Sequence, residues 1–305
     1  MVFSNVLNQV AVLLLIMLTG FYSGKRNIMG KEVNKKLSEL LLKITNPLLV
    51  ISSFQTAFQK ELMISVAIVF IFAVCAHIAS ALLGMLLFHK FGDARKKIMK
   101  FSAIYSNCGF VGFPILGSLF GNLGVLLGSV YVAVFNIFLW TNGVMIFSSV
   151  EKQSKKMYIR AFANPGIFSV LIGLILFVFS LQLPYAITAA VQLVGSMTVP
   201  LSMLIVGANI AACRLSTLFK GMDLFFASAV RLLVLPLLAF FILKLLGFSD
   251  MLLSTCVLLV AMPAAATTAI FTEMYEGDTS FAARVVALST LLSLITVPLI
   301  ILFLQ

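Results

Sequence analysis

Two prolines in similar apolar surroundings are the residues of this sequence that point most clearly to a binding function. Pro114 follows Asn107, with Gly109 and Gly112 between them, and Pro263 precedes a run of alanines. A proline inside a helix removes one backbone donor and clashes with the preceding turn. We therefore expect both helices to be broken at mid-depth in a membrane, where freed amides favour an anion and freed carbonyls favour a cation or a donor.

Polar and small side chains beside these prolines can line such a site. Asn107 lies about two helical turns before Pro114, and its amide either caps the broken helix or contacts a ligand. Thr267 and Thr268, which come after Pro263, are the analogous candidates in the other helix, although threonine often bonds to its own helix. Further candidates for the lining, or for polar contacts between helices, are Ala264, Ala265, Asn46 and Asn136.

Ionisable residues inside the apolar segments are few, and the clearest are Arg231, His77 and Lys43. Arg231 either faces a carboxylate substrate or pairs structurally near the end of its helix, and Lys43 is placed similarly. His77 can carry a proton near physiological pH or serve as a packing residue. The apolar segments show no Asp or Glu placed to relay protons across the membrane. Transport coupled to sodium, transport coupled to protons, exchange and facilitated diffusion are therefore all open alternatives.

Catalysis is not expected, because the histidines, His77 and His89, lie far from any pair of carboxylates. The four cysteines have no CxxC spacing, so neither a disulfide framework nor a metal site is indicated. We expect no cofactor beyond a sodium ion or a proton as coupling ion. A channel or a sensor is an alternative, since broken helices also occur in channels.

The elements that must position these residues are membrane helices. Hydrophobic residues make up 62% of the 305 residues and charged residues 10%, with a mean hydropathy of +1.15, which is typical of a polytopic membrane protein. Apolar runs long enough to cross a bilayer predict ten transmembrane helices at about 5–24, 37–57, 62–88, 98–120, 124–149, 165–182, 186–211, 223–246, 250–273 and 280–304.

The positive charges indicate how these helices are oriented. The formal net charge is +11, and the Lys and Arg residues concentrate in the connections near residues 25–36, 90–100, 152–160 and 214–220. By the positive-inside rule these connections are cytoplasmic. We therefore predict a multi-pass protein of the cell membrane with both termini extracytoplasmic, and we expect the lipid bilayer, not a nucleic acid, as its surroundings.

An internal repeat accompanies this topology. The segment around Pro47 resembles that around Pro200, and the pair Pro114 and Pro263 is separated by a similar distance of about 150 residues. Two units of five helices each must enter the membrane from opposite sides. We predict a first five-helix repeat at 1–150, a cytoplasmic linker at 151–163 and an inverted second repeat at 164–305.

The motifs along the chain resemble those of the auxin efflux carrier family, which includes plant PIN-FORMED carriers and bacterial permeases for malate, malonate and similar acids. The resemblance covers essentially the whole chain. It rests on Asn107-x6-Pro114 with Gly112 between, Ala261-Met-Pro263 followed by small residues, Phe271-Thr-Glu273-Met-Tyr275, Asn46-Pro47, Asn164-Pro165 and Ser289-Thr290 with Thr296-Val-Pro298.

The resemblance implies an all-α fold of two inverted five-helix repeats, in which helices 4 and 9 cross at their prolines. It also implies a scaffold bundle of spans 1, 2, 6 and 7, a transport bundle of the other spans, elevator-like alternating access, and a homodimer. The family's substrate-contacting asparagine corresponds to Asn107.

The expected substrate is a small organic anion such as a mono- or dicarboxylate. Ala264 and Ala265 replace the Gln-Gly pair of plant carriers, and Thr268 stands where their second proline would fall, which argues against auxin. The alternative within transporters is a sodium-coupled symporter of the bile-acid type.

Overall fold

The computed structural model describes residues 2–147, 165–212, 218–248 and 250–304. Over these ranges the chain is helical, and the β-structure is limited to one isolated bridge between Ser106 and Ala264. The predicted linker at 151–163 and Asn164 of the Asn-Pro motif lie outside the described residues.

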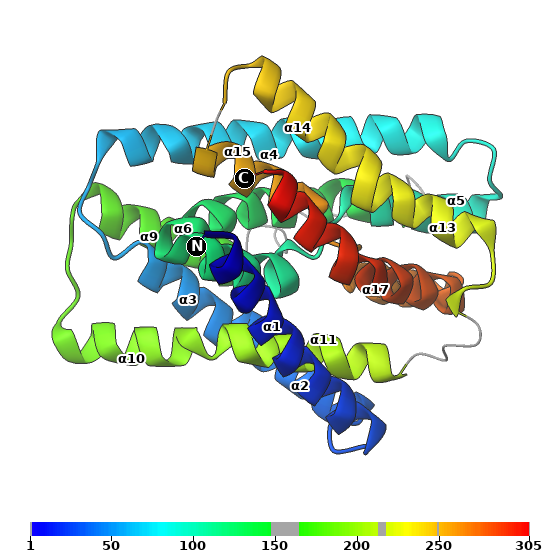
Figure 1. The fold of residues 1–305 in the computed structure, drawn as a ribbon, viewed down its shortest axis with the longest axis horizontal. Coiled ribbons are helices and arrows are strands. Elements are labelled where there is room, and N and C mark those ends of the chain that lie inside the picture. Colours follow the sequence, from blue (N-terminus) through cyan, green and yellow to red (C-terminus); the bar gives the residue numbers. More distant parts are fainter. Residues whose placement is uncertain (1, 148–164, 213–217, 249, 305) are drawn as a thin grey trace. The chain divides into compact units, whose positions relative to one another are not determined.

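The helices of the first part of the chain, coloured blue to green in Figure 1, are α1 (Val2–Lys25), α2 (Lys31–Leu40), α3 (Asn46–Ser53), α4 (Lys60–Leu87), α5 (Asp93–Ile104), α6 (Phe113–Phe138) and α7 (Val144–Phe147). Those of the second part are α9 (Pro165–Val178), α10 (Tyr185–Ser196), α11 (Thr198–Ala212), α13 (Met222–Ala229), α14 (Leu235–Leu245), α15 (Asp250–Ala261), α16 (Thr267–Met274) and α17 (Thr279–Phe303). Wider π-helical turns continue several of them at η1 (Leu41–Thr45), η2 (Cys108–Gly112), η3 (Leu139–Gly143) and η5 (Val230–Val234).

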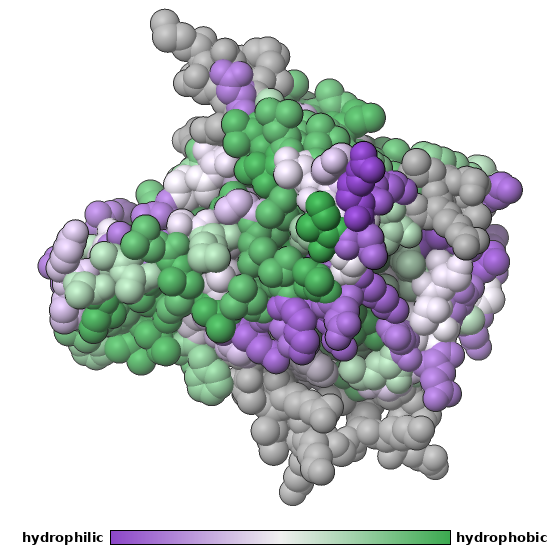
Figure 2. Space-filling view, turned by 90° about the horizontal axis from the view of Figure 1, so that it is seen from below, coloured by the Kyte–Doolittle hydropathy of each residue, from purple (hydrophilic) through white to green (hydrophobic). Residues whose placement is uncertain are grey.

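The length and apolar character of these helices suit a bilayer. Five helical stretches among the described residues are long and apolar enough to cross a membrane, namely Lys60–Leu87, Cys108–Phe147, Tyr185–Ala212, Met222–Leu245 and Thr279–Phe303. Shorter apolar helices cover Ala11–Lys25, Pro165–Val178 and Met251–Ala261. Large hydrophobic side chains such as Leu15, Ile71 and Phe241 are exposed, and hydrophobic residues cover broad areas of the face in Figure 2. Such a surface is suited to contact with lipid.

The prediction that Pro114 breaks its helix is wrong in detail. The interruption lies at Tyr105–Asn107, between α5 and η2, whereas Pro114 is the second residue of α6. The chain then turns sharply at Gly121, where φ is 60° and ψ is −146°, within the range assigned to α6. The turn at Gly121 coincides with the predicted boundary between the segments 98–120 and 124–149.

Wide turns explain how the helices accommodate proline. Pro47, Pro114 and Pro236 each stand two residues after the last residue of a π-helical turn. A proline ring cannot donate a hydrogen bond and collides with a carbonyl of the preceding turn, and a wider turn relieves this collision. These three prolines are therefore absorbed within continuous helical segments. Pro263, in contrast, lies in non-helical chain between α15 and α16, as predicted.

The chain packs into two compact units. The first unit contains Met1–Phe70, Gly109–Ala133 and Ala163–Ala212, and the second contains Ile71–Cys108, Val134–Phe162 and Cys213–Gln305. The first therefore includes the predicted spans 1, 2, 6 and 7 together with residues 109–133 of spans 4 and 5. The second includes spans 8 to 10, most of span 3 and the remaining residues of spans 4 and 5.

In the first unit, α1 packs against α11 (Figure 1) through small residues. A Cβ atom at Gly20 would lie 2.2 Å from the Leu204 carbonyl oxygen, and one at Gly207 would lie 1.9 Å from the Met17 carbonyl oxygen. Glycines at these positions let two helix backbones touch, as is common between helices in membranes.

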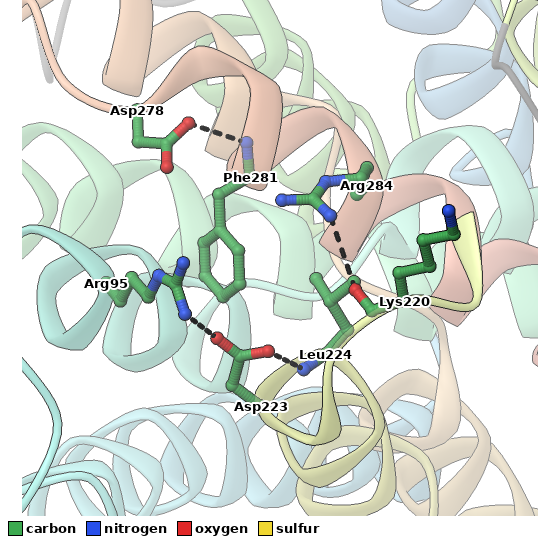
Figure 3. A network of polar contacts seen from close by, with 7 residues as sticks. All are labelled: Arg95, Lys220, Asp223, Leu224, Asp278, Phe281 and Arg284. Carbon is green, nitrogen blue, oxygen red and sulfur yellow. Dashed lines mark hydrogen bonds and ion pairs between the residues drawn. The ribbon is translucent and has the colours of Figure 1, made fainter. Parts of the chain in front are cut away.

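In the second unit, a polar network joins the beginnings of α5, α13 and α17 (Figure 3). Arg95 Nη1 lies 2.5 Å from Asp223 Oδ2, and the Arg95 and Arg284 guanidinium groups lie 5.3 and 5.9 Å from the centre of the Phe281 ring. Arg284 also donates to the Lys220 carbonyl oxygen. The network holds one end of this unit together, separate from the helix interruptions.

We predict that Gly207→Ala destabilises the protein. The added methyl group has no room beside the Met17 carbonyl, and overpacking of this kind costs about 1–3 kcal/mol. The measurement is the temperature of thermal unfolding of the purified protein. Gly92→Ala is the matched control, because a Cβ at Gly92 meets nothing within 4 Å. Equal unfolding temperatures for the two variants would show that α1 and α11 do not approach as described.

Candidate functional site

Two non-helical segments of the second unit, at residues 105–107 and 262–266, meet each other. The Asn107 N–H donates to the Pro263 carbonyl at 2.7 Å, and the Ala265 N–H donates to the Tyr105 carbonyl at 2.9 Å. These bonds flank an antiparallel bridge between Ser106 and Ala264. The chain between α5 and η2 thus crosses the chain between α15 and α16. The family resemblance implies such a crossing, but at Pro114 and Pro263, and here the first of the two segments crosses at residues 105–107.

Local sequence explains why this crossing can form. Pro263 has no N–H and restricts the residue before it to extended conformations, so α15 ends at Ala261. Ala264 and Ala265 are buried, and their small side chains allow close approach of the other segment. Some backbone groups of each extended segment form hydrogen bonds with the other segment. Such internal partners are needed because water is absent from a membrane interior.

The beginning of α16 contributes donors to the crossing. The backbone N–H groups of Ala266 and Thr267 make none of the hydrogen bonds found among the described residues. Two fully buried hydroxyls, Ser106 Oγ and Thr268 Oγ1, also have no partner in the described structure. The Thr267 Oγ1 atom likewise has no partner there, although its residue is half-buried. A buried unpaired polar group is costly, so this cluster is a candidate for binding a polar solute.

Asn107 stands at the start of the helical chain that follows the crossing. Its residue is buried, and its side-chain amide takes part in none of the hydrogen bonds recorded for the described part of the chain. The Ala264 N–H, in contrast, already donates to Ser289 Oγ of α17 at 3.2 Å. The side-chain amide of Asn107, the unpaired backbone N–H groups before α16 and the unpaired hydroxyls are chemically suited to bind a carboxylate.

Arg231 bonds to the carbonyl side of the same crossing. Its Nε donates to the Met262 carbonyl at 3.0 Å, and its Nη1 donates to the Ala103 carbonyl at 2.6 Å. Its Nη2 donates to the Val260 carbonyl. With 1% of its surface exposed, Arg231 does not reach outward to water; it caps the C-terminal ends of α5 and α15, where helix dipoles favour a cation.

Tyr105 fixes the first crossing segment to the helix formed by α6, η3 and α7. Its hydroxyl donates to the Phe138 carbonyl at 2.8 Å and lies 3.2 Å from Asn142 Oδ1. The wide turn η3 begins directly after Phe138, and a π-helical turn frees a carbonyl for an outside donor. Gly143 leaves space for this contact, because a Cβ there would approach the Tyr105 hydroxyl to 3.3 Å.

His77 packs beside Tyr105 within an aromatic cluster. Its ring centre lies 6.2 Å from that of Tyr105 and 5.0 Å from that of Phe138. Its Nδ1 lies 2.7 Å from the Ala73 carbonyl, a geometry that assigns the ring proton to Nδ1 because a carbonyl only accepts. The placement agrees with the packing interpretation of His77, and a role in proton coupling stays a prediction.

The other candidate residues lie elsewhere. Asn136 is half-buried in the later part of α6, next in sequence to Phe135, whose ring contacts Tyr105. Gly109, Gly112, Pro114, Asn46 and Lys43 belong to the first unit. There, Asn46 is buried with its Oδ1 unpartnered among the described residues, and Lys43 is largely exposed, 4.0 Å from Glu39.

Sequence reasoning missed three residues of the crossing, namely Tyr105, Ser106 and Ser289. Ser106 adjoins Asn107, so its place in the interrupted segment could have been inferred once the break was located correctly. Nothing in the sequence alone pairs Tyr105 with a carbonyl of α6 or Ser289 with the Ala264 amide, because these contacts join residues far apart in the chain.

We predict that Tyr105→Phe lowers the stability of the protein by about 0.5–1.5 kcal/mol. The Phe138 carbonyl loses the Tyr105 donor and keeps only the longer bond of 3.3 Å from the Thr141 hydroxyl among its side-chain donors in the described structure. Thermal unfolding of the purified variant measures the loss. Tyr22→Phe serves as the control, since Tyr22 is 57% exposed. If both tyrosine variants unfolded at the same temperature as the unmodified protein, the hydroxyl would not anchor the crossing.

Comparison with known proteins places the sequence of this chain in a family. Residues 5–301 match the family described as membrane transport protein. An uncharacterised transporter of Methanothermobacter thermautotrophicus is 24% identical over 302 residues, covering 98% of each chain. An uncharacterised transporter of Methanocaldococcus jannaschii is 25% identical over 308 residues, covering 96% of this chain and 97% of that protein.

The match extends over nearly the whole sequence, including both crossing segments, and it agrees with the apolar helices of the fold. The expectation of a transporter accords with it. The chain belongs to the membrane transport protein family, that of the auxin efflux carriers, and is a multi-pass membrane transporter.

Proposed function

We propose that this protein is a secondary transporter that moves a small organic anion, such as a mono- or dicarboxylate, by alternating access. The crossing in the second unit is its substrate site. Asn107, the N–H groups before and at the start of α16, and the hydroxyls of Ser106, Thr267 and Thr268 bind the anion. The observation that carries the proposal is the set of three buried hydroxyls and two backbone N–H groups that have no partners among the described residues, with Asn107 beside them.

The charges of the crossing favour an anion. Each helix C-terminus carries roughly −0.5 of a unit charge and each N-terminus roughly +0.5. The guanidinium of Arg231 bonds to the ends of α5 and α15 and offsets their combined negative charge. The positive ends at the start of η2 and α16 keep no opposing side-chain charge near them among the contacts described above. A carboxylate supplies that charge and accepts hydrogen bonds from the unused donors.

The side chains at the crossing indicate how the proposed substrate is recognised. Ala264 and Ala265 offer no polar group of their own, so recognition there depends on backbone amides and on small hydroxyls. Such a set suits a compact carboxylate, for which each oxygen can accept several bonds.

The proposed membrane arrangement has ten transmembrane helices in two inverted repeats of five. The similar segments around Pro47 and Pro200, together with the basic connections, support it. In this arrangement both termini are extracytoplasmic and the protein lies in the cell membrane.

The two compact units suit an elevator-like mechanism. The first unit contains the spans that the family resemblance assigns to a scaffold, together with residues 109–133 of spans 4 and 5, and the crossing with its bonds to Arg231 and Tyr105 lies within the second. We propose that the second unit moves with its bound substrate, because its internal bonds can then stay intact throughout the cycle.

We predict that mono- and dicarboxylates raise the temperature of thermal unfolding and that Asn107→Ala removes this effect. A ligand that binds only the folded state stabilises it in proportion to its occupancy, and the variant lacks one donor and one acceptor of the site. A panel including malate, malonate and a monocarboxylate is tested on purified protein, followed by uptake of the best ligand into proteoliposomes.

Asn122→Ala is the matched control, because Asn122 is exposed; it should respond to carboxylates as the unmodified protein does. A selective shift lost only in Asn107→Ala supports the proposal. Absence of any shift with carboxylates in folded protein, or a shift that persists in Asn107→Ala, contradicts it.

A further inference from the structure

Arg231 is buried more completely than its place in an apolar helix led us to expect. It lies in the wide turn η5, and its guanidinium bonds to carbonyls from two separate helix ends. A guanidinium has five N–H donors and holds its charge at any physiological pH. The carbonyls of Ala103, Val260 and Met262 are therefore occupied by a permanent positive charge from within the chain.

These three carbonyls are the groups that an ion would use. Where helices are interrupted in a transporter, the unwound carbonyls and the C-terminal ends of half-helices coordinate sodium. Here the guanidinium of Arg231 bonds to those oxygens itself. In addition, a unit charge about 4 Å away lowers sodium affinity by roughly a thousandfold at the effective dielectric constant of a protein site.

We propose that Arg231 is the resident cation of the crossing. It stands where a coupling sodium ion would bind, balances the negative ends of α5 and α15, and keeps the crossing assembled without an external ion. Binding and transport then do not depend on sodium. The statement about transport rests on the proposed function, but sodium binding can be measured without any substrate.

The geometry assigns Arg231 a positioning role, because three of its hydrogen bonds go to backbone oxygens at the ends of the two interrupted helices. Its replacement by a neutral residue should open a vacant carbonyl cluster. In such a variant, sodium can take over the lost positive charge and the lost bonds.

The test is thermal unfolding of the purified full-length protein in sodium, potassium or choline chloride at equal ionic strength, with no carboxylate present. The variants are Arg231→Ala and Arg231→Gln, which remove the charge, and Arg231→Lys, which keeps it. Lys244→Gln is the matched control, because it removes an exposed positive charge from α14 of the same helical segment.

For the unmodified protein, Arg231→Lys and Lys244→Gln, we expect an unfolding temperature that does not change among the three salts. Arg231→Ala should unfold at a lower temperature in choline and gain at least about 3 °C in sodium. Arg231→Gln should behave in the same way, so the test does not depend on a single variant folding.

Two results would overturn the proposal. A saturable, sodium-specific rise in the unmodified protein would show that sodium has a site despite Arg231. A loss of stability that is equal in all salts in both neutral variants would show that Arg231 only packs and bonds. Neither result depends on carboxylate binding, so failure here is distinguishable from failure of the proposed substrate.

Discussion

Backbone groups freed inside an apolar protein must find partners, and this constraint organises the second unit. At the crossing, the two interrupted segments pair some of their backbone groups with each other, through the hydrogen bonds from Asn107 to Pro263 and from Ala265 to Tyr105. Side chains pair with further backbone groups: Arg231 donates to carbonyls, and Ser289 accepts from the Ala264 N–H. What is left over is a small set of donors, and a solute that accepts hydrogen bonds can complete it.

Four of the prolines show two different responses of the helices, while Pro298 lies inside α17 with neither a wide turn nor a break. At Pro47, Pro114 and Pro236 a wide turn takes up the missing bond and the helical segment continues, whereas at Pro263 the helix stops and the chain becomes extended. The difference lies in what surrounds the proline: an extended segment of another helix is available to pair with Pro263 and Ala265. A broken helix is stable where a second broken helix meets it, which makes the pair a structural unit.

Much of this could be read from the sequence, and the remainder depends on contacts that a sequence does not display. Composition and hydropathy indicated the membrane helices, and Pro263 with its alanines marked one interruption. The position of the other was misjudged because a proline can be absorbed by a wide turn, so Pro114 is near the crossing in sequence without forming it. The partners of Arg231 are three carbonyls distant in sequence, and periodicity carries no information about such bonds.

The central claim is that the crossing binds an organic anion, and the most direct measurement is to locate one. A crystal of the protein soaked with a brominated dicarboxylate would reveal the bromine through its anomalous scattering. The account predicts a peak within contact distance of Asn107, Thr267 and Thr268, with the guanidinium of Arg231 still on its carbonyls. A peak elsewhere in the protein, with the crossing donors bonded only to water, would contradict it.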